Sequence, residues 1–193
     1  MKNSSKVYLP ILLFFLPTLW SCEKSTDSTT TPQVDQNLIP NSSFESATGP
    51  LIEGWNFRDS TIYDFFPVAP AGGGNYSVLL RPVWHGPFSF NSVMRRVALP
   101  VGTHRYRLSC WAKRLPDGAG FLALFVGPGD VDTMTTAMTI PIADTVWTSY
   151  SRNTVITNQA SGTVVVALHG GYSPVGYPAD STFFDLCRFE KLD

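Results

Sequence analysis

The segment HRYRLSCWAKR, residues 104–114, decides the fold class of this chain. Its even positions from 106 to 112 hold Tyr, Leu, Cys and Ala, which suit an apolar core. Its odd positions from 105 to 113 hold Arg, Arg, Ser, Trp and Lys, which suit solvent or a ligand. Because side chains alternate between the two faces of a strand, this pattern predicts a sheet with one buried face. Trp111, a large aromatic residue among cations, is the interesting member of the exposed set.

Further segments rich in β-branched and aromatic residues lie on both sides of this strand. We expect strands at Thr61–Phe66, Tyr76–Arg81, Ser92–Leu99, Phe121–Val126, Met134–Ile140, Val146–Thr154, Thr163–His169 and Thr182–Leu192. Turns rich in Gly, Pro, Asn and Asp separate them, as at Gly72–Asn75 and Gly127–Asp130. No window of a dozen residues keeps a helical period. The chain is therefore predicted to be all-β, a jelly-roll β-sandwich of two antiparallel sheets.

The N-terminal residues are of a different kind. Lys2 and Lys6 precede the apolar stretch Val7–Leu19, and Ser21-Cys22 follow it. This order predicts a signal peptide over residues 1–21, and it resembles a bacterial lipoprotein signal in which Cys22 becomes the lipidated first residue. The apolar stretch is shorter than the roughly 20 residues of a membrane span. The alternative is an ordinary secretory signal with an unrelated cysteine.

Residues 22–36 carry almost nothing to bury and are expected to form a flexible polar tether before one domain at 37–193. Acidic residues just after Cys22 resemble the export signals of surface lipoproteins of Bacteroidetes. We therefore expect a lipid anchor in the outer membrane, with the domain at the cell surface or on the periplasmic face.

The composition of the chain and the spacing of its residues argue against several functions. With 15% charged residues and a net charge of −1, the chain has no basic stripe, so no nucleic-acid partner is expected. The three histidines lack metal-binding spacing, and neither a G-x-S-x-G motif nor a phosphate-binding glycine loop is present. A pair of carboxylates for glycoside hydrolysis among Asp59, Asp64 and Asp180 has no support from spacing. We do not expect an enzyme.

Six short motifs carry more specific information. NSSFE (41–45) with Gly54-Trp55 opens the domain, and FDLCRF (184–189) closes it. Between them come GNYSVL (74–79), the stretch 97–108 with Gly102 and Tyr106, LSCWAK (108–113) and VWTSY (146–150). Their order resembles that of the galactose-binding-like jelly rolls, which include carbohydrate-binding modules of families four, nine, sixteen and twenty-two. The resemblance implies a binding module with Trp55 in its core. Arg95 stands where those families often have Gln.

The resemblance also implies a structural calcium ion held by Glu45 and Asp185. Two carboxylates from opposite ends of the domain, completed by backbone carbonyls, are ligands that Ca²⁺ accepts. The alternative is that Glu45 caps a turn and Asp185 accepts backbone hydrogen bonds.

Cys110 and Cys187 lie at core-facing positions of strands that the same families place in one sheet. A disulfide between them is chemically allowed outside the cytoplasm. Two buried free thiols, acting as small hydrophobic groups, are the alternative.

Candidate ligand contacts come from two loops rich in turn residues and from the strand at 104–114. Trp84, His85 and Phe88 belong to one loop, Tyr172 and Tyr177 to the other, and Arg107 and Trp111 to the strand face between them. Sugar rings stack their C–H faces on such aromatic residues. Alternatively, each aromatic residue covers one end of the sandwich. The two functions to be distinguished are capture of a polysaccharide or oligosaccharide, and docking of an envelope protein by a structural lipoprotein.

Overall fold

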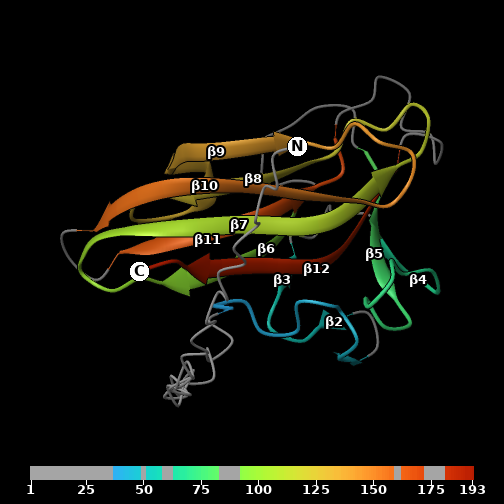
Figure 1. The fold of residues 1–193 in the computed structure, drawn as a ribbon, viewed down its shortest axis with the longest axis horizontal. Helices are drawn as coiled ribbons and strands as arrows, with labels where there is room; N and C mark the ends of the chain where they lie inside the picture. The colour runs from blue at the N-terminus through green and yellow to red at the C-terminus, as the bar shows by residue number, and fades with distance from the viewer. Residues whose placement is uncertain (1–36, 49–50, 58–62, 83–91, 159–161, 172–180) are drawn as a thin grey trace, which may run out of the picture. The chain divides into compact units, whose positions relative to one another are not determined.

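The computed structural model describes residues 37–48, 51–57, 63–82, 92–158, 162–171 and 181–193, all within a compact unit that spans Val34–Asp193. Two five-stranded antiparallel sheets form a sandwich (Figure 1). We call them the β7 sheet and the β11 sheet. The β7 sheet has the order β10 (Thr148–Asn158), β7 (Gly102–Arg114), β12 (Thr182–Lys191), β5 (Ser77–Leu80), β4 (Tyr63–Phe66). The β11 sheet has the order β3 (Asn56–Phe57), β6 (Ser92–Ala98), β11 (Thr163–His169), β8 (Phe121–Val126), β9 (Thr135–Pro141).

All nine predicted segments are strands, and the two at Phe121–Val126 and Thr163–His169 have the predicted bounds. β10 begins two residues later than expected and continues to Asn158, because its whole length pairs with β7. Three two-residue strands were not predicted: β3 and the paired β1 (Ala47–Thr48) and β2 (Leu51–Ile52). A short 3₁₀ helix, η2 (Val131–Thr133), was also not predicted. No helix among the described residues is long and apolar enough to cross a membrane.

The core lies between the inner faces of the two sheets and follows from the alternation of β7. Tyr106, Leu108, Cys110 and Ala112 are all buried there, and Tyr106 stacks on Phe189 of β12 with ring centroids 5.0 Å apart. Trp55 is 5% exposed and donates its indole N–H to the carbonyl of Asn41, so its predicted place in the core is confirmed.

A β-bulge interrupts the pairing of β12 with β7. Asp185 pairs with Trp111 and Arg188 pairs with Ser109, so Leu186 and Cys187 together face Cys110. Leu186 absorbs the extra residue in a left-handed conformation with φ of 47°. The bulge leaves Asp185 on the outer face of the sheet and Cys187 in the core.

Candidate functional site

The outer face of the β11 sheet is unusual in being apolar. A second hydrophobic cluster covers it, separate from the core between the sheets: Met94, Ala123, Phe125, Val131, Met134, Val165 and Ala167. Val131 and Met134 come from η2 and the residue after it, which pack over the strands. The strands β8 and β11 are therefore buried on both faces, which explains their continuous apolar sequences.

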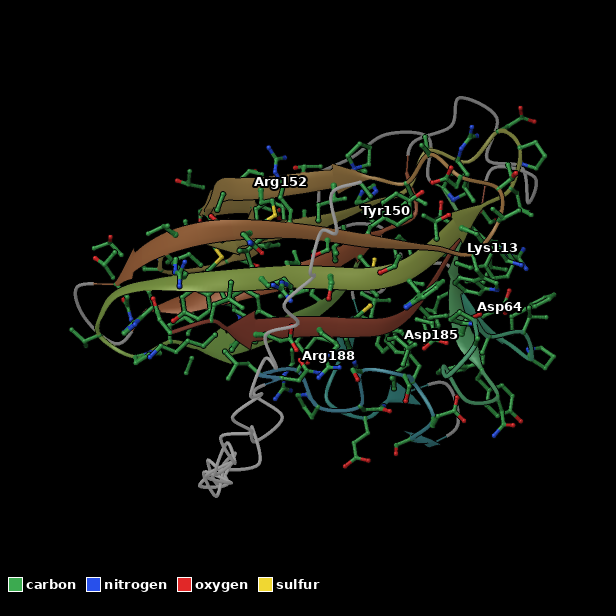
Figure 2. The ribbon with its side chains drawn as sticks, in the orientation of Figure 1. Asp64, Lys113, Tyr150, Arg152, Asp185 and Arg188 are labelled. Atoms are coloured by element: carbon green, nitrogen blue, oxygen red, sulfur yellow. The ribbon has the colours of Figure 1, made fainter. Side chains whose placement is uncertain are left out.

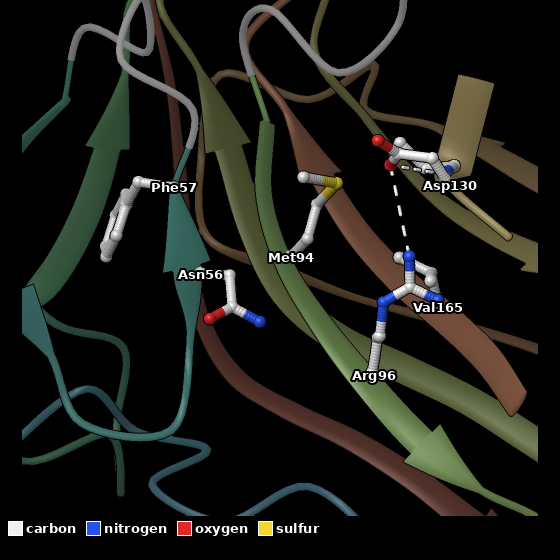
Figure 3. Close-up of a pocket in the computed structure, with 7 residues that line it drawn as sticks. Asn56, Phe57, Met94, Arg96, Asp130 and Val165 are labelled. Atoms are coloured by element: carbon white, nitrogen blue, oxygen red, sulfur yellow. Dashed lines mark hydrogen bonds and ion pairs between the residues drawn. The ribbon is translucent and has the colours of Figure 1, made fainter.

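A pocket of about 190 Å³ opens beside this cluster, between β3, β6, β11 and η2 (Figure 3). Met94 and Val165 form its apolar floor, and Asn56 lies across from Met94 in the register of β3 and β6. Ligand pockets commonly combine such an apolar floor with a few polar groups that orient the ligand.

The polar groups of this pocket are an amide and an ion pair. Arg96 Nη2 lies 3.9 Å from Asp130 Oδ1, and both side chains are about half exposed. Asp130 is the N-cap of η2, where its carboxylate accepts the N–H of Val131 at 2.7 Å. The pocket thus offers guanidinium donors, a carboxylate acceptor and the amide of Asn56, which both donates and accepts.

Sequence reasoning singled out Arg95 on this strand, whereas the neighbouring Arg96 lines the pocket. Val93 and Val97 bury the other face of β6, and Arg95 shares that inner face with them. Its guanidinium donates to the carbonyl of Gly54 at 2.6 Å. Arg95 is therefore a structural residue.

His169 closes one end of the apolar face. It is fully buried, its ring stacks on Phe121 with centroids 4.4 Å apart, and its Nδ1 accepts the N–H of Gly171 at 2.8 Å. Burial lowers the pKa of His169 to about 4. The imidazole is therefore neutral at neutral pH.

Two other recesses lie elsewhere on the sandwich, one with an uncharged lining and one with a mainly polar lining. One, of about 650 Å³, lies at an end of the sandwich near Leu99, Ile156 and Val164, and no aromatic or charged residue of the described chain lines it. The other, of about 430 Å³, separates the edge strands β9 and β10, where Arg152 Nη1 donates to the carbonyl of Thr139 at 3.3 Å.

The candidate ligand residues proposed from sequence are only partly placed. Trp84, His85, Phe88, Tyr172 and Tyr177 lie outside the described residues. Arg107 and Trp111 are on the outer face of the β7 sheet, the opposite side of the sandwich from the pocket. The structure therefore does not bring these two residues together with the pocket. The pocket itself was not predicted from the sequence.

Glu45 and Asp185, the proposed calcium ligands, meet at a glycine turn before β5. Glu45 Oε1 accepts the N–H groups of Asn75 and Tyr76 at 3.0 and 2.9 Å. A Cβ at Gly74 would lie 2.6 Å from the Glu45 carboxyl carbon, and one at Gly73 would lie 2.1 Å from Asp185 Oδ2. Both glycines are needed because a carboxylate occupies the space of a side chain.

Asp185 is fully buried, and its Oδ2 has no hydrogen-bond partner in the described chain. Its Oδ1 accepts the N–H of Leu186 at 2.6 Å. Burial and, to a smaller extent, the negative charge of Glu45 raise the pKa of Asp185 to about 7, although the hydrogen bond from the Leu186 N–H opposes this shift. An unsatisfied buried carboxylate oxygen beside a second carboxylate fits a hard cation such as Ca²⁺. No cluster of three or more His, Cys, Asp or Glu side chains occurs in the described ranges, so carbonyl oxygens would complete the site.

Cys110 and Cys187 are buried neighbours on β7 and β12, as the resemblance implied. Both are free thiols in the structure. Burial, followed by a hydrogen bond with Cys110, raises the pKa of the Cys187 thiol well above its usual value. The disulfide stays a prediction, which mass measurement after alkylation with and without reductant tests.

Comparison with known proteins identifies the fold. No sequence model of a protein family and no curated protein sequence matches this chain. Among solved structures, a family 16 carbohydrate-binding module has a TM-score of 0.56 and 16% identity over 79% of this chain and 99% of its own.

Two more solved structures of carbohydrate-binding modules are similar to this chain in fold. A family 4 carbohydrate-binding module has a TM-score of 0.53 and 13% identity, covering 80% of this chain and 99% of its own. The xylan-binding CBM22-1 domain of Paenibacillus barcinonensis Xyn10C has a TM-score of 0.51 and 12% identity, covering 79% and 92%. The chain thus has the jelly-roll sandwich fold of carbohydrate-binding modules, as predicted.

Proposed function

We propose that this protein is a non-catalytic glycan-binding module, and that the pocket on the outer face of the β11 sheet binds part of a sugar chain. The observation that carries the proposal is an apolar floor with a polar rim, on a fold shared with carbohydrate-binding modules. A pyranose ring presents C–H groups to Met94 and Val165, while its hydroxyls bond to Asn56, Arg96 and Asp130. At about 190 Å³ the pocket is smaller than a drug-sized site, which suits one sugar unit of a longer chain.

Affinity electrophoresis against neutral plant and algal polysaccharides tests this assignment. We expect at least one polysaccharide to retard the protein, and Asn56→Ala and Arg96→Ala each to reduce that retardation. Arg152→Ala is the matched control, because Arg152 is an exposed arginine that contacts Thr139 in a different recess. Retardation that both pocket variants leave intact contradicts the assignment.

The competing function is docking of an envelope protein, which calls for a broad exposed apolar patch. Among the described residues, the most exposed large hydrophobic side chains come from β4 and the loop after it, the β6–β7 turn, and β10 with the residues before it: Phe66, Val68, Tyr76, Val101, Val146 and Val155. No retardation by any glycan, with co-purification of one defined protein, would favour docking.

The proposed place of action is the outer membrane. In this proposal Cys22 carries the lipid, residues 23–36 form the tether, and the domain captures glycan at the cell surface. The order of basic, apolar and small residues before Cys22 supports it. We expect the parent chain to incorporate labelled fatty acid and to fractionate with membranes, and Cys22→Ser to do neither. Membrane association of Cys22→Ser would contradict lipid anchoring at this residue.

We further propose that Ca²⁺ binds between Glu45 and Asp185, where it stabilises the fold by joining the first residues of the domain to β12. The ion satisfies Asp185 Oδ2 and neutralises the repulsion between the two carboxylates. Saturating calcium, at about 100 times the dissociation constant, adds about 2.7 kcal/mol to the free energy of unfolding. We expect EDTA to lower the Tm of the parent chain but not that of Asp185→Asn. Equal Tm values with calcium and with EDTA would refute the site.

A further inference from the structure

The outer face of the β7 sheet carries an aromatic cluster that the pocket does not use. Phe183 of β12 lies at its centre, with Phe66 edge-on at 5.4 Å and Trp147 at 6.2 Å between ring centroids. Lys113 of β7 pairs in register with Phe183, and its Nζ lies 4.8 Å from the Phe183 centroid and 5.1 Å from the Trp147 ring centroid. The ammonium group of Lys113 therefore lies near two rings, those of Phe183 and Trp147, and the third ring, Phe66, packs against Phe183.

One polar group of this cluster has no hydrogen-bond partner among the described residues. The buried indole Nε1 of Trp147 meets no acceptor in the described parts of the chain. Phe66 is 42% exposed, so the cluster reaches the surface. Figure 2 shows Lys113, Asp64 and Asp185 at this end of the sheet. Asp185 is buried beside the Gly73 turn.

The cations of this face fall into two groups. Three have carboxylate partners: Arg81 with Asp64 at 2.7 Å, Arg105 with Asp193 at 3.9 Å, and Arg188 with Glu190 at 3.2 Å. Lys113 and Arg107 have no carboxylate at ion-pair distance within the described residues, and Arg107 Nε donates to Asn153 Oδ1 at 3.4 Å. These two cations lie on the same face of β7, about 20 Å apart along the strand. Trp111 stands between them, partly exposed.

We propose that this face is a second glycan-binding surface, selective for acidic polysaccharides. Lys113 and Arg107 bind carboxylate or sulfate groups at two points along one chain, and Trp111 and Phe66 contact sugar rings. The inference rests on the proposed function in taking a glycan as ligand, but it uses the opposite side of the sandwich. A neutral glycan would leave both cations unpaired, whereas an acidic one forms charge-assisted hydrogen bonds with them.

Two matched pairs of polymers test the charge requirement by affinity electrophoresis of the full chain. One pair is polygalacturonate and its methyl ester, and the other is dextran sulfate and dextran. We expect the charged member of at least one pair to retard the protein and the neutral member to do so much less, and the pair that responds identifies carboxylate or sulfate as the recognised group. Lys113→Ala and Arg107→Ala should each weaken binding of the charged polymer on the order of tenfold. Arg105→Ala, which removes an already paired cation of the same face, is the control.

The remaining outcomes separate this inference from the proposed function. Binding of neutral polymers alone, or binding of charged polymers that depends on Arg96 and not on Lys113, overturns the second surface and leaves the first. Equal retardation by polyglutamate, which has charge but no sugar, overturns recognition of glycan at this face. Lack of retardation by every glycan overturns both.

Discussion

The outer faces of the two sheets differ in their cover and in the sequences of their strands. On the β11 sheet, η2 and Met134 pack over part of the strands, so the outward side chains of β8 and β11 beneath them (Ala123, Phe125, Val165 and Ala167) are apolar and buried. On the β7 sheet, the outward side chains of β7 stay polar or aromatic and at least partly exposed, as the burial pattern of Gly102–Arg114 shows. The comparison teaches that the cover over a face, and not the strand pattern alone, decides whether it forms a pocket or an open surface.

The largest difference in unfolding free energy should appear when one aromatic residue on each outer face is changed to Ala. Phe125, 3% exposed on the β11 sheet, should cost about 3–5 kcal/mol of unfolding free energy when changed to Ala. Trp111→Ala on the open face should cost about 1 kcal/mol, because the side chain is already partly in water. Urea denaturation of both variants measures the difference. Equal losses would mean that the β7 sheet is covered as deeply as the β11 sheet.

A pH-dependent loss of nearly the same size should follow from His169. Its pKa is about 4 in the folded chain and about 6.5 when unfolded, so below pH 6.5 the unfolded chain binds the proton first. Stability should therefore fall as pH drops from about 6.5 to 4, by about 1.4 kcal/mol per unit at most.

The raised pKa of Asp185 gives a slope of opposite sign over an overlapping range. The parent chain is therefore compared with His169→Gln, both with calcium chelated, so that the difference between them isolates the histidine. An unchanged slope in His169→Gln would show that His169 is not held neutral by burial.

A smaller effect on stability is expected at the Gly73 turn, which covers Asp185 on the outer face of the β7 sheet. Gly73→Ala places a Cβ 2.1 Å from Asp185 Oδ2 and should destabilise the fold by about 1–3 kcal/mol through overpacking. Adding Asp185→Ala removes the obstructing atom, so the double variant should lose less than the sum of the two single variants. Thermal unfolding of the three variants measures this coupling, and strict additivity would contradict the contact.

The smallest effect on stability is expected at the pocket rim. Arg96 and Asp130 are half-exposed and 3.9 Å apart, so Arg96→Ala should change the free energy of unfolding by less than about 1 kcal/mol. Glycan retardation should nevertheless fall. Urea unfolding beside affinity electrophoresis checks both; a large loss of stability would make Arg96 a structural residue.

Local patterns predicted most of the sandwich but not its pocket. The alternation of residues 104–114 gave both the strand and its two faces, because one face of β7 is open. FLALFV at 121–126 predicted a strand without orientation, since both its faces are buried. Arg95 and Arg96 are adjacent and chemically identical. Arg95 shares the inner face of β6 with Val93 and Val97, and its hydrogen bond to the Gly54 carbonyl is a contact distant in sequence.

Other parts of the site depend on contacts distant in sequence. β3 has only two residues, and its pairing with Met94 and Val93 defines one wall of the pocket. The Glu45–Asp185 pair was found from motif resemblance alone, since nothing local links residues at opposite ends of the domain. The cluster around Lys113 combines residues near 66, 113, 147 and 183, and only Lys113 belongs to the exposed face that the alternation of residues 104–114 predicted.

The bulge in β12 has a consequence for how this strand tolerates changes in length. A strand has a reading frame of two, and one inserted residue ordinarily exchanges inside for outside in everything that follows. Here Leu186 is the extra residue, and its left-handed backbone conformation confines the break in inward and outward alternation to this one position. Removing Leu186 would therefore leave Cys187 and Phe189 facing inward and Arg188 and Glu190 facing outward. The chain would lose the Leu186 N–H, which donates a hydrogen bond to Asp185 Oδ1. The extra residue of the bulge therefore helps to position the Asp185 carboxylate.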